Sequence, residues 1–213
     1  MSPLRPSLLA RLRPLMAGLV LGAGLLALPA QAGTVLVWGD SLSAGFGLAR
    51  GQGWAWLLEQ KLASTKPTQN VVNGSVSGET TAGGLTRLPA ALATHKPDVV
   101  ILELGANDGL RGLSPQTMEK NLESMVDASQ KAGARVLLVG MRMPPNYGPD
   151  YTRRYEEAFA GLARRRKLAF VPFLMEGFAD KPELFQQDGI HPAPQAQGIM
   201  LDTVFKGLKP LLR

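Results

Sequence analysis

The chain has 213 residues, a formal net charge of +6 and no cysteine. The absence of cysteine excludes disulfides, thiol catalysis and cysteine-ligated metal sites. Three of the positive charges are arginines in the first thirteen residues, and the remaining charge of +3 gives no indication of nucleic-acid binding.

Residues 1–32 have the pattern of a signal peptide. The three arginines precede an apolar run over residues 15–28, and the small residues Ala30 and Ala32 form an Ala-x-Ala cleavage pattern. The run is shorter than the roughly twenty residues that a membrane span needs, although an uncleaved membrane anchor is the alternative interpretation. We therefore predict an exported protein, periplasmic or secreted, whose mature chain is a single domain of residues 33–213 without an integral membrane span.

After this leader, short apolar runs alternate with longer segments of helical character. Continuous apolar runs of this length are typical of strands that are buried on both faces of a parallel sheet. The predicted elements are, in chain order, strand 34–38, helix 53–62, strand 71–72, helix 80–93, strand 99–104, helix 115–131, strand 135–141, helix 151–166, strand 168–171 and helix 195–211. The alternation predicts an α/β fold, a three-layer α/β/α sandwich with a five-stranded parallel sheet.

A polar cluster follows each predicted strand. Parallel sheets bind ligands at the carboxyl ends of their strands, so functional residues should follow strands and not precede them. The five clusters are residues 39–41, 73–78, 105–108, 142–147 and, after a longer loop, 188–192. Because all five fall on one edge of the sheet, we predict the functional site there.

The chain has two histidines, and only one of them falls on that edge. A serine hydroxyl needs a neighbouring base to act as a nucleophile at neutral pH. His95 precedes the third strand, so we expect a solvent-exposed loop residue at the opposite edge. His191 follows Asp188 by three residues, and Gly189 lets the chain turn between them. The pattern predicts a catalytic triad in which Ser41 is the nucleophile, His191 the base and Asp188 the carboxylate that orients the ring.

An acyl-transfer site also needs hydrogen-bond donors for the oxyanion. The predicted donors are the backbone N–H groups of Ser41 and Gly78 and the side-chain amide of Asn107, with the missing Cβ of Gly78 allowing close approach. Each residue has a purely structural alternative: Ser41, Asp188 and His191 as helix or turn caps, Gly78 as a turn glycine, and Asn107 as an Asx turn. No Gly-x-Ser-x-Gly elbow is present, so the α/β-hydrolase design is excluded.

In these motifs the chain resembles the SGNH (GDSL) hydrolases. Ser41, Gly78, Asn107 and His191 match the four residues of that family in order. The stretches NGSVSGET, GANDGLRG, MRMPPNYG and PELFQQDGIHP resemble its bacterial periplasmic thioesterase I/lysophospholipase and arylesterase subgroup. The resemblance implies a flavodoxin-like fold and a serine esterase for acyl-CoA thioesters, lysophospholipids and aryl or short-to-medium acyl esters. One departure is Glu79, where members of the subgroup often have aspartate.

Apolar residues of the loop before His191 are predicted to bind the acyl or aryl group, although they could instead cover the edge of the sheet. The predicted substrate contacts are Asp40, Pro144, Tyr147, Phe173, Met175, Phe178 and Ile190. The expected partner is a small-molecule acyl ester or thioester, and we expect a monomer that uses no metal or other cofactor.

Two other functions stay open. A carbohydrate O-acetyl esterase with the same triad would have a polar, aromatic-lined site. A non-catalytic exported ligand-binding module would leave Ser41, Asp188 and His191 unexplained as a set. The basic run over residues 164–167 is typical of a solvated helix end, and contact with anionic headgroups is the alternative.

Overall fold

The computed structural model describes residue 1, residues 33–65 and residues 68–212. Apart from Met1, the predicted signal peptide lies outside the described residues, so the structure does not test it. Within the described part of the chain, no helix is long and apolar enough to cross a membrane.

Five parallel strands form one sheet with the order β2-β1-β3-β4-β5. The strands are β1 (Gly33–Gly39), β2 (Gln69–Asn73), β3 (Val99–Glu103), β4 (Arg135–Val139) and β5 (Ala169–Val171). In the centre of the sheet, Val35 of β1 pairs with Val71 on one side and Val99 on the other. All five residues of β3 and the last five of β1 are buried, which is the reason that these strands are apolar except for Glu103 at the end of β3.

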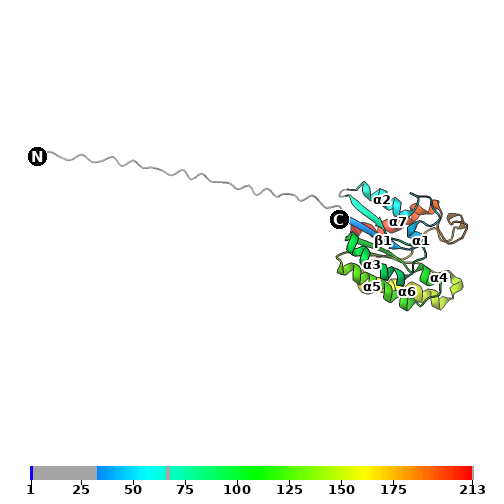
Figure 1. Cartoon of the computed structure of the whole chain (residues 1–213). Coiled ribbons are helices and arrows are strands. Elements are labelled where there is room, and N and C mark those ends of the chain that lie inside the picture. The colour runs from blue at the N-terminus through cyan, green and yellow to red at the C-terminus, as the bar shows by residue number, and fades with distance from the viewer. Residues whose placement is uncertain (2–32, 66–67, 213) are drawn as a thin grey trace. The chain divides into compact units, whose positions relative to one another are not determined.

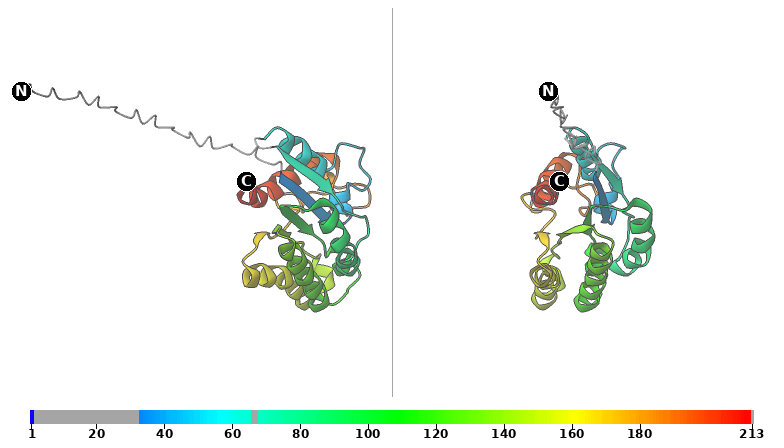
Figure 2. Two further views of the ribbon diagram at one scale, coloured as in Figure 1. Left: turned by 60° about the vertical axis from the view of Figure 1, so that its left-hand side comes forward. Right: turned by 90° about the vertical axis from the view of Figure 1, so that its left-hand side faces the viewer.

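Helices cover both faces of this sheet. Helices α2 and α7 pack together on one face, and α3, α5 and α6 pack on the other, as Figure 1 and the two views in Figure 2 show. The longer helices are α2 (Trp54–Ala63), α3 (Thr81–His95), α5 (Pro115–Lys131), α6 (Pro149–Arg166) and α7 (Gln197–Leu208). The predicted three-layer α/β/α sandwich is therefore confirmed.

Large apolar side chains, repeated at helical spacing along the helices, pack these layers together. Trp54, Leu58 and Leu62 recur every four residues along α2 and are fully buried. On the other face, Tyr155 and Phe159 of α6 are four residues apart and pack edge to face, with ring centroids 5.4 Å apart. Each such buried side chain stabilises the fold by about 1.5–3 kcal/mol relative to an exposed one.

Two short helices that the sequence does not predict lie at the carboxyl edge of the sheet. Helix α1 (Ser41–Ala44) follows β1 directly, and α4 (Ala106–Leu110) follows β3. Both are visible at the same edge in Figure 1. With four and five residues, they are too short to show a helical period in the sequence.

The fourth strand is shorter than predicted. It ends at Val139: Gly140 still donates its N–H to the Val171 carbonyl of β5, but the Gly140 carbonyl accepts the N–H of Leu174, which lies beyond β5. The residues that follow leave the sheet, so Met141 and Met143 belong to the edge where the polar clusters meet.

Candidate active site

Ser41 is the first residue of α1, and its neighbour Asp40 caps that helix. The Oδ1 atom of Asp40 accepts the N–H of Leu42 at 3.0 Å. Because Asp40 satisfies the helix terminus, the half-buried hydroxyl of Ser41 is not needed as a cap. The capping interpretation of Ser41 is therefore wrong, and its oxygen is available to the partner described next.

The Ser41 hydroxyl meets the imidazole of His191. Its Oγ lies 2.9 Å from Nε2, although the two residues are 150 positions apart in the sequence. On the other side of the ring, Nδ1 lies 2.7 Å from Oδ2 of Asp188. Hydroxyl, imidazole and carboxylate are thus in series, which is the arrangement by which a serine loses its proton to a histidine that a carboxylate orients.

Asp188 has two functions, one for each of its oxygens. Oδ2 contacts the His191 ring, while Oδ1 accepts the backbone N–H groups of Ile190 at 2.9 Å and His191 at 3.0 Å. These hydrogen bonds lower the pKa of Asp188 to about 2, with the backbone bond from His191 as the largest cause. The turn that the sequence suggests as an alternative to catalysis is present, and it positions the same carboxylate beside the ring.

Asn107 is held by Asp40. Its Nδ2 donates to Oδ2 of Asp40 at 3.1 Å, and the Asp40 side chain is fully buried. Burial raises the pKa of Asp40 to about 6, against the hydrogen bonds from Leu42 and Asn107, which lower it. In its ionised form, Asp40 accepts from both of these groups and fixes the rotation of the Asn107 amide.

A second carboxyl group is buried behind Asp40. Glu103, the last residue of β3, accepts the hydroxyl of Ser43 at 2.5 Å. Burial, and then the charge of Asp40, raise the pKa of Glu103 well above its usual range. Two neighbouring carboxyl groups in a dry site disfavour simultaneous ionisation, which is why the charge of Asp40 adds to the effect of burial on the pKa of Glu103.

Gly78 lies in the loop after β2 with φ +79°, a conformation that favours glycine. A Cβ built on Gly78 would meet no atom of the protein within 4 Å, so the backbone angle is the requirement for glycine that the fold itself makes here. Close approach of a substrate through the missing Cβ stays a prediction. Arg111 donates from Nη2 to the Gly78 carbonyl at 3.0 Å and so ties this loop to the segment after α4.

Asp108 joins the Gly78 loop to Asn107. Its two carboxylate oxygens accept the N–H of Thr81 at 2.8 Å and the hydroxyl of Thr81 at 2.6 Å. Thr81 begins α3, just after Gly78, and Asp108 is the neighbour of Asn107. The sequence motif predicts a role only for Asn107, whereas the structure shows a buried carboxylate that fixes the spacing of two of the three predicted oxyanion donors.

An apolar cavity of about 620 Å³ opens beside these groups. Ser41, Asn107 and His191 line it, and Asp40 lies at its base. Of the predicted substrate contacts, it includes Asp40, Pro144, Phe173, Met175 and Ile190. Leu110, Met141 and Met143, which follow strands three and four and are not among the predicted substrate contacts, increase the apolar character of the wall, and Arg142 adds a charged group.

Two predicted substrate contacts do not line this cavity. The Phe178 side chain is fully buried and packs against Phe185, with ring centroids 5.7 Å apart, so it belongs to the core beneath the loop. The hydroxyl of Tyr147 donates to the Leu110 carbonyl at 2.9 Å, and its ring stacks on Tyr151. Both corrections have the same reason: apolar residues near the edge of a sheet are used first to cover it.

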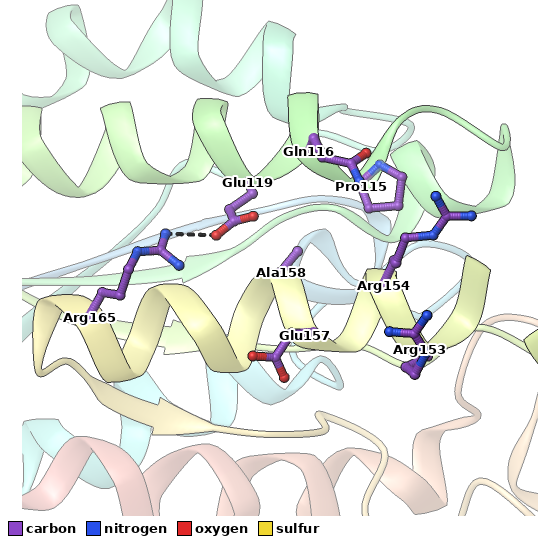
Figure 3. A pocket seen from close by; sticks show the side chains of 8 residues that line it. All are labelled: Pro115, Gln116, Glu119, Arg153, Arg154, Glu157, Ala158 and Arg165. Atoms are coloured by element: carbon purple, nitrogen blue, oxygen red, sulfur yellow. Dashed lines mark hydrogen bonds and ion pairs between the residues drawn. The ribbon is translucent and has the colours of Figure 1, made fainter. Parts of the chain in front are cut away.

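The other histidine and the basic run lie away from this site. His95 is the exposed last residue of α3, at the opposite edge of the sheet, as predicted. A smaller hollow between α5 and α6 includes Arg165, which pairs with Glu119 at 2.7 Å (Figure 3). Arg164 pairs with Glu157, and Arg166 with Glu123 and Asp127. The arginines of the basic run are thus paired with acidic side chains of the same chain.

The sequence model of the GDSL-like lipase/acylhydrolase family matches residues 37–199, which include all the catalytic and cavity-lining groups described above. The chain belongs to the GDSL-like lipase/acylhydrolase family. Membership in this GDSL family confirms the resemblance seen in the motifs and makes the protein an acylhydrolase. The GDSL pattern has its four residues in the same order as Ser41, Gly78, Asn107 and His191 have in this chain. Each of the four lies in a segment that follows a strand of the sheet.

Other members of the GDSL family are similar over most of their length. Esterase TesA of Pseudomonas aeruginosa is 49% identical over 188 residues, covering 88% of this chain and 94% of that protein. Thioesterase 1/protease 1/lysophospholipase L1 of Escherichia coli K12 is 44% identical over 183 residues, covering 86% of each. A crystal structure of TesA has a TM-score of 0.79 at 49% identity, covering 84% of this chain and 99% of that chain.

Proposed function

We propose that the protein is an exported serine esterase that hydrolyses acyl esters and thioesters, including acyl-CoA, lysophospholipids and aryl esters, through an acyl-enzyme. The observation that carries this proposal is the series Ser41 Oγ, His191 Nε2 at 2.9 Å, and His191 Nδ1 with Asp188 Oδ2 at 2.7 Å. The names of the relatives, an esterase and a thioesterase/lysophospholipase, support the substrate range.

The proposed reaction proceeds in two halves. His191 takes the proton of Ser41 as its oxygen attacks the carbonyl carbon, and the Asp188 carboxylate stabilises the imidazolium. The oxyanion is bound by the N–H groups of Ser41 and Gly78 and the amide of Asn107. His191 then gives its proton to the leaving alcohol or thiol. Water, deprotonated by His191, attacks the acyl-enzyme, and the acid leaves as Ser41 recovers its proton.

The cavity supports acyl groups larger than acetyl. Its wall includes the side chains of Leu110, Met141, Met143, Phe173 and Met175, which suit an aliphatic or aryl chain and offer few hydrogen bonds to a sugar. This composition favours the ester and thioester proposal over a carbohydrate O-acetyl esterase.

A fluorophosphonate probe tests the catalytic part of the proposal. We expect covalent labelling of the protein, mapped to Ser41 by mass spectrometry, and none in Ser41→Ala or His191→Gln. A hydrolysis panel of acyl-CoA, lysophospholipid, p-nitrophenyl esters of increasing chain length and acetylated xylan then tests the substrate class. Labelling that persists in Ser41→Ala would refute the mechanism, and turnover of acetylated xylan alone would favour the carbohydrate esterase.

Export and processing are part of the same proposal. The arginines, apolar run and Ala-x-Ala pattern of residues 1–32 support cleavage after Ala32, giving a mature, monomeric domain of residues 33–213. The mass of the protein recovered from the periplasm and the culture medium of a Gram-negative host would test this. We expect the mature mass in one of those fractions, and a full-length protein retained in the membrane would support the anchor instead.

A further inference from the structure

Large exposed apolar side chains gather at the edge of the sheet that carries the candidate active site. Apart from Met1, the described residues hold six of them: Phe46, Trp56, Val76, Leu110, Leu113 and Ile190, each between 39% and 50% exposed. Trp56 lies in the first turn of α2, and the other five lie in segments that follow strands. In the described part of the chain, no loop at the opposite edge carries one.

Five of these side chains, here called the apolar collar, border the candidate active site: Phe46, Val76, Leu110, Leu113 and Ile190. Leu110 and Ile190 line the cavity, and the Phe46 ring centroid lies 4.6 Å from that of His191. Val76 donates its N–H to the carbonyl of Gly39, next to Asp40, at 3.1 Å. Leu113 donates its N–H to the carbonyl of Asp108, next to Asn107, at 2.9 Å. Three members of the collar thus adjoin the cavity or the His191 ring, and the other two lie in segments that are hydrogen-bonded to the backbone next to Asp40 and Asn107.

One cation at the collar has no acidic partner among the described residues. Arg111, between Leu110 and Leu113, is exposed, and its Nη2 donates a hydrogen bond to the Gly78 carbonyl. In contrast, the three arginines at the end of α6 are paired with glutamate or aspartate. The positive charge of Arg111 thus remains available to an anionic group outside the protein.

We propose that the apolar collar and Arg111 dock the protein on a phospholipid surface that contains anionic headgroups. This proposal rests on the proposed function, which supplies the reason for docking: the substrates carry acyl chains. A long acyl chain that crosses water on its way to an enzyme loses the hydrophobic stabilisation of its methylenes, whereas a chain that moves along the collar into the cavity stays covered. An exposed apolar patch beside a binding site is typical of an interaction surface, and Arg111 is placed to contact a phosphate.

Vesicle flotation with the full protein tests the docking surface. The probe is vesicles of equimolar phosphatidylethanolamine and phosphatidylglycerol, and the protein carries Ser41→Ala so that no turnover changes the lipid. We expect it to float with the vesicles. Adding Val76→Ser and Leu113→Ser, at two positions outside the cavity wall, should weaken binding about tenfold, because less apolar area is buried. Adding Arg111→Gln instead should weaken it about fivefold at low salt and reduce its salt dependence.

His95→Ser is the matched control, because it removes an exposed ring at the opposite edge of the sheet and should leave binding unchanged. Binding that is absent, or that is unaffected by the double serine substitution, would overturn the proposal. A dimer in solution that the double substitution dissociates would also overturn it, since the collar would then bind a second copy of the chain. Hydrolysis of a soluble short-chain ester by the wild-type protein, measured in parallel, reports on the proposed function independently of vesicle binding.

Discussion

Asn107 donates a hydrogen bond of 3.1 Å from its side-chain amide to the buried carboxylate of Asp40. The bond links the segment after β3 to the residue that precedes Ser41. A primary amide has two hydrogens, so one is fixed on Asp40 and the other stays free for a substrate oxyanion. Asp40, predicted from the sequence as a substrate contact, also positions a donor.

The pKa of Asp40 predicts how stability depends on pH. Its value of about 6 in the folded protein lies above the usual 3.8, so the folded state holds this proton more tightly. This contribution to the free energy of unfolding is fully present below about pH 4 and is lost as the pH rises through about 6. Asp40→Asn has no titrating group at this position, so this contribution should be absent. The difference in the free energy of unfolding between the wild-type protein and Asp40→Asn, measured by urea unfolding, should therefore change between pH 4 and 6 and be constant at higher pH.

Asp40→Asn should also lower kcat by about tenfold to a hundredfold at pH 8, since the new amide cannot accept from both Leu42 and Asn107. In the wild-type protein, protonation of Asp40 should lower kcat below about pH 6 for the same reason. Unfolding curves with the same pH dependence in both proteins, or an unchanged kcat in the variant, would contradict the role given to this carboxylate.

Asp188→Asn should lower kcat for a soluble p-nitrophenyl ester by about 10⁴ with little effect on the fold. The asparagine Oδ1 can still accept the N–H groups of Ile190 and His191, so the turn is retained while the carboxylate on the ring is lost. Stopped assays at a saturating ester concentration measure the effect, and His95→Gln should have wild-type kcat. A loss of less than about tenfold in Asp188→Asn would show that Asp188 only makes the turn.

Gly78→Ala and Gly133→Ala form a matched pair. Both glycines have positive φ, +79° and +90°, and a Cβ at either position would meet no atom within 4 Å. Each substitution should therefore lower the free energy of unfolding by about 1–2 kcal/mol through backbone strain alone. Gly133 lies between α5 and β4, at the opposite edge, so only Gly78→Ala should lower kcat as well, by about tenfold or more. Equal kcat values for the two variants would remove Gly78 from the oxyanion site.

Glu79 and Arg87 fix the loop that contains Gly78. Arg87 pairs with Glu79, donates to the Gly74 carbonyl at 3.3 Å, and lies 4.2 Å over the Trp38 ring. A Cβ at Gly83 would overlap Oε1 of Glu79, so the glycine leaves room for the longer acid in place of the aspartate that is common in the subgroup. The departure at Glu79 therefore has a structural counterpart in the first turn of α3.

Arg87→Ala should consequently lower kcat about tenfold with KM nearly unchanged, because the adjacent Gly78 N–H is no longer held in place. Arg153→Ala is the control, since Arg153 pairs with Asp150 on the exposed surface of α6 and should leave kcat unchanged. Steady-state kinetics on a soluble ester compare the two variants. A change in KM alone, or an equal effect of both substitutions, would place the function of Arg87 elsewhere.

Much of the fold and of the candidate site could be predicted from the sequence. The five strands and five longer helices are found close to their predicted positions, because strands buried on both faces must be continuously apolar and helices must repeat their apolar residues. The short helices α1 and α4 escaped prediction, since Asp40 and Gly105 start them with conformations that depend on neighbouring strands.

The sequence by itself determined which residues meet: in parallel strands joined by helices, every segment after a strand reaches the same edge, so Ser41, Asn107 and His191 had to converge. Only the tertiary structure decided what those residues touch. The contact of Asn107 with Asp40 spans 67 positions, and the burial of Phe178 and the exposure of Leu113 depend on packing between elements. The succession of strands and helices along the chain and their hydrophobic periods are local properties, whereas side-chain partners and exposure are set by surfaces that exist only after the layers have packed.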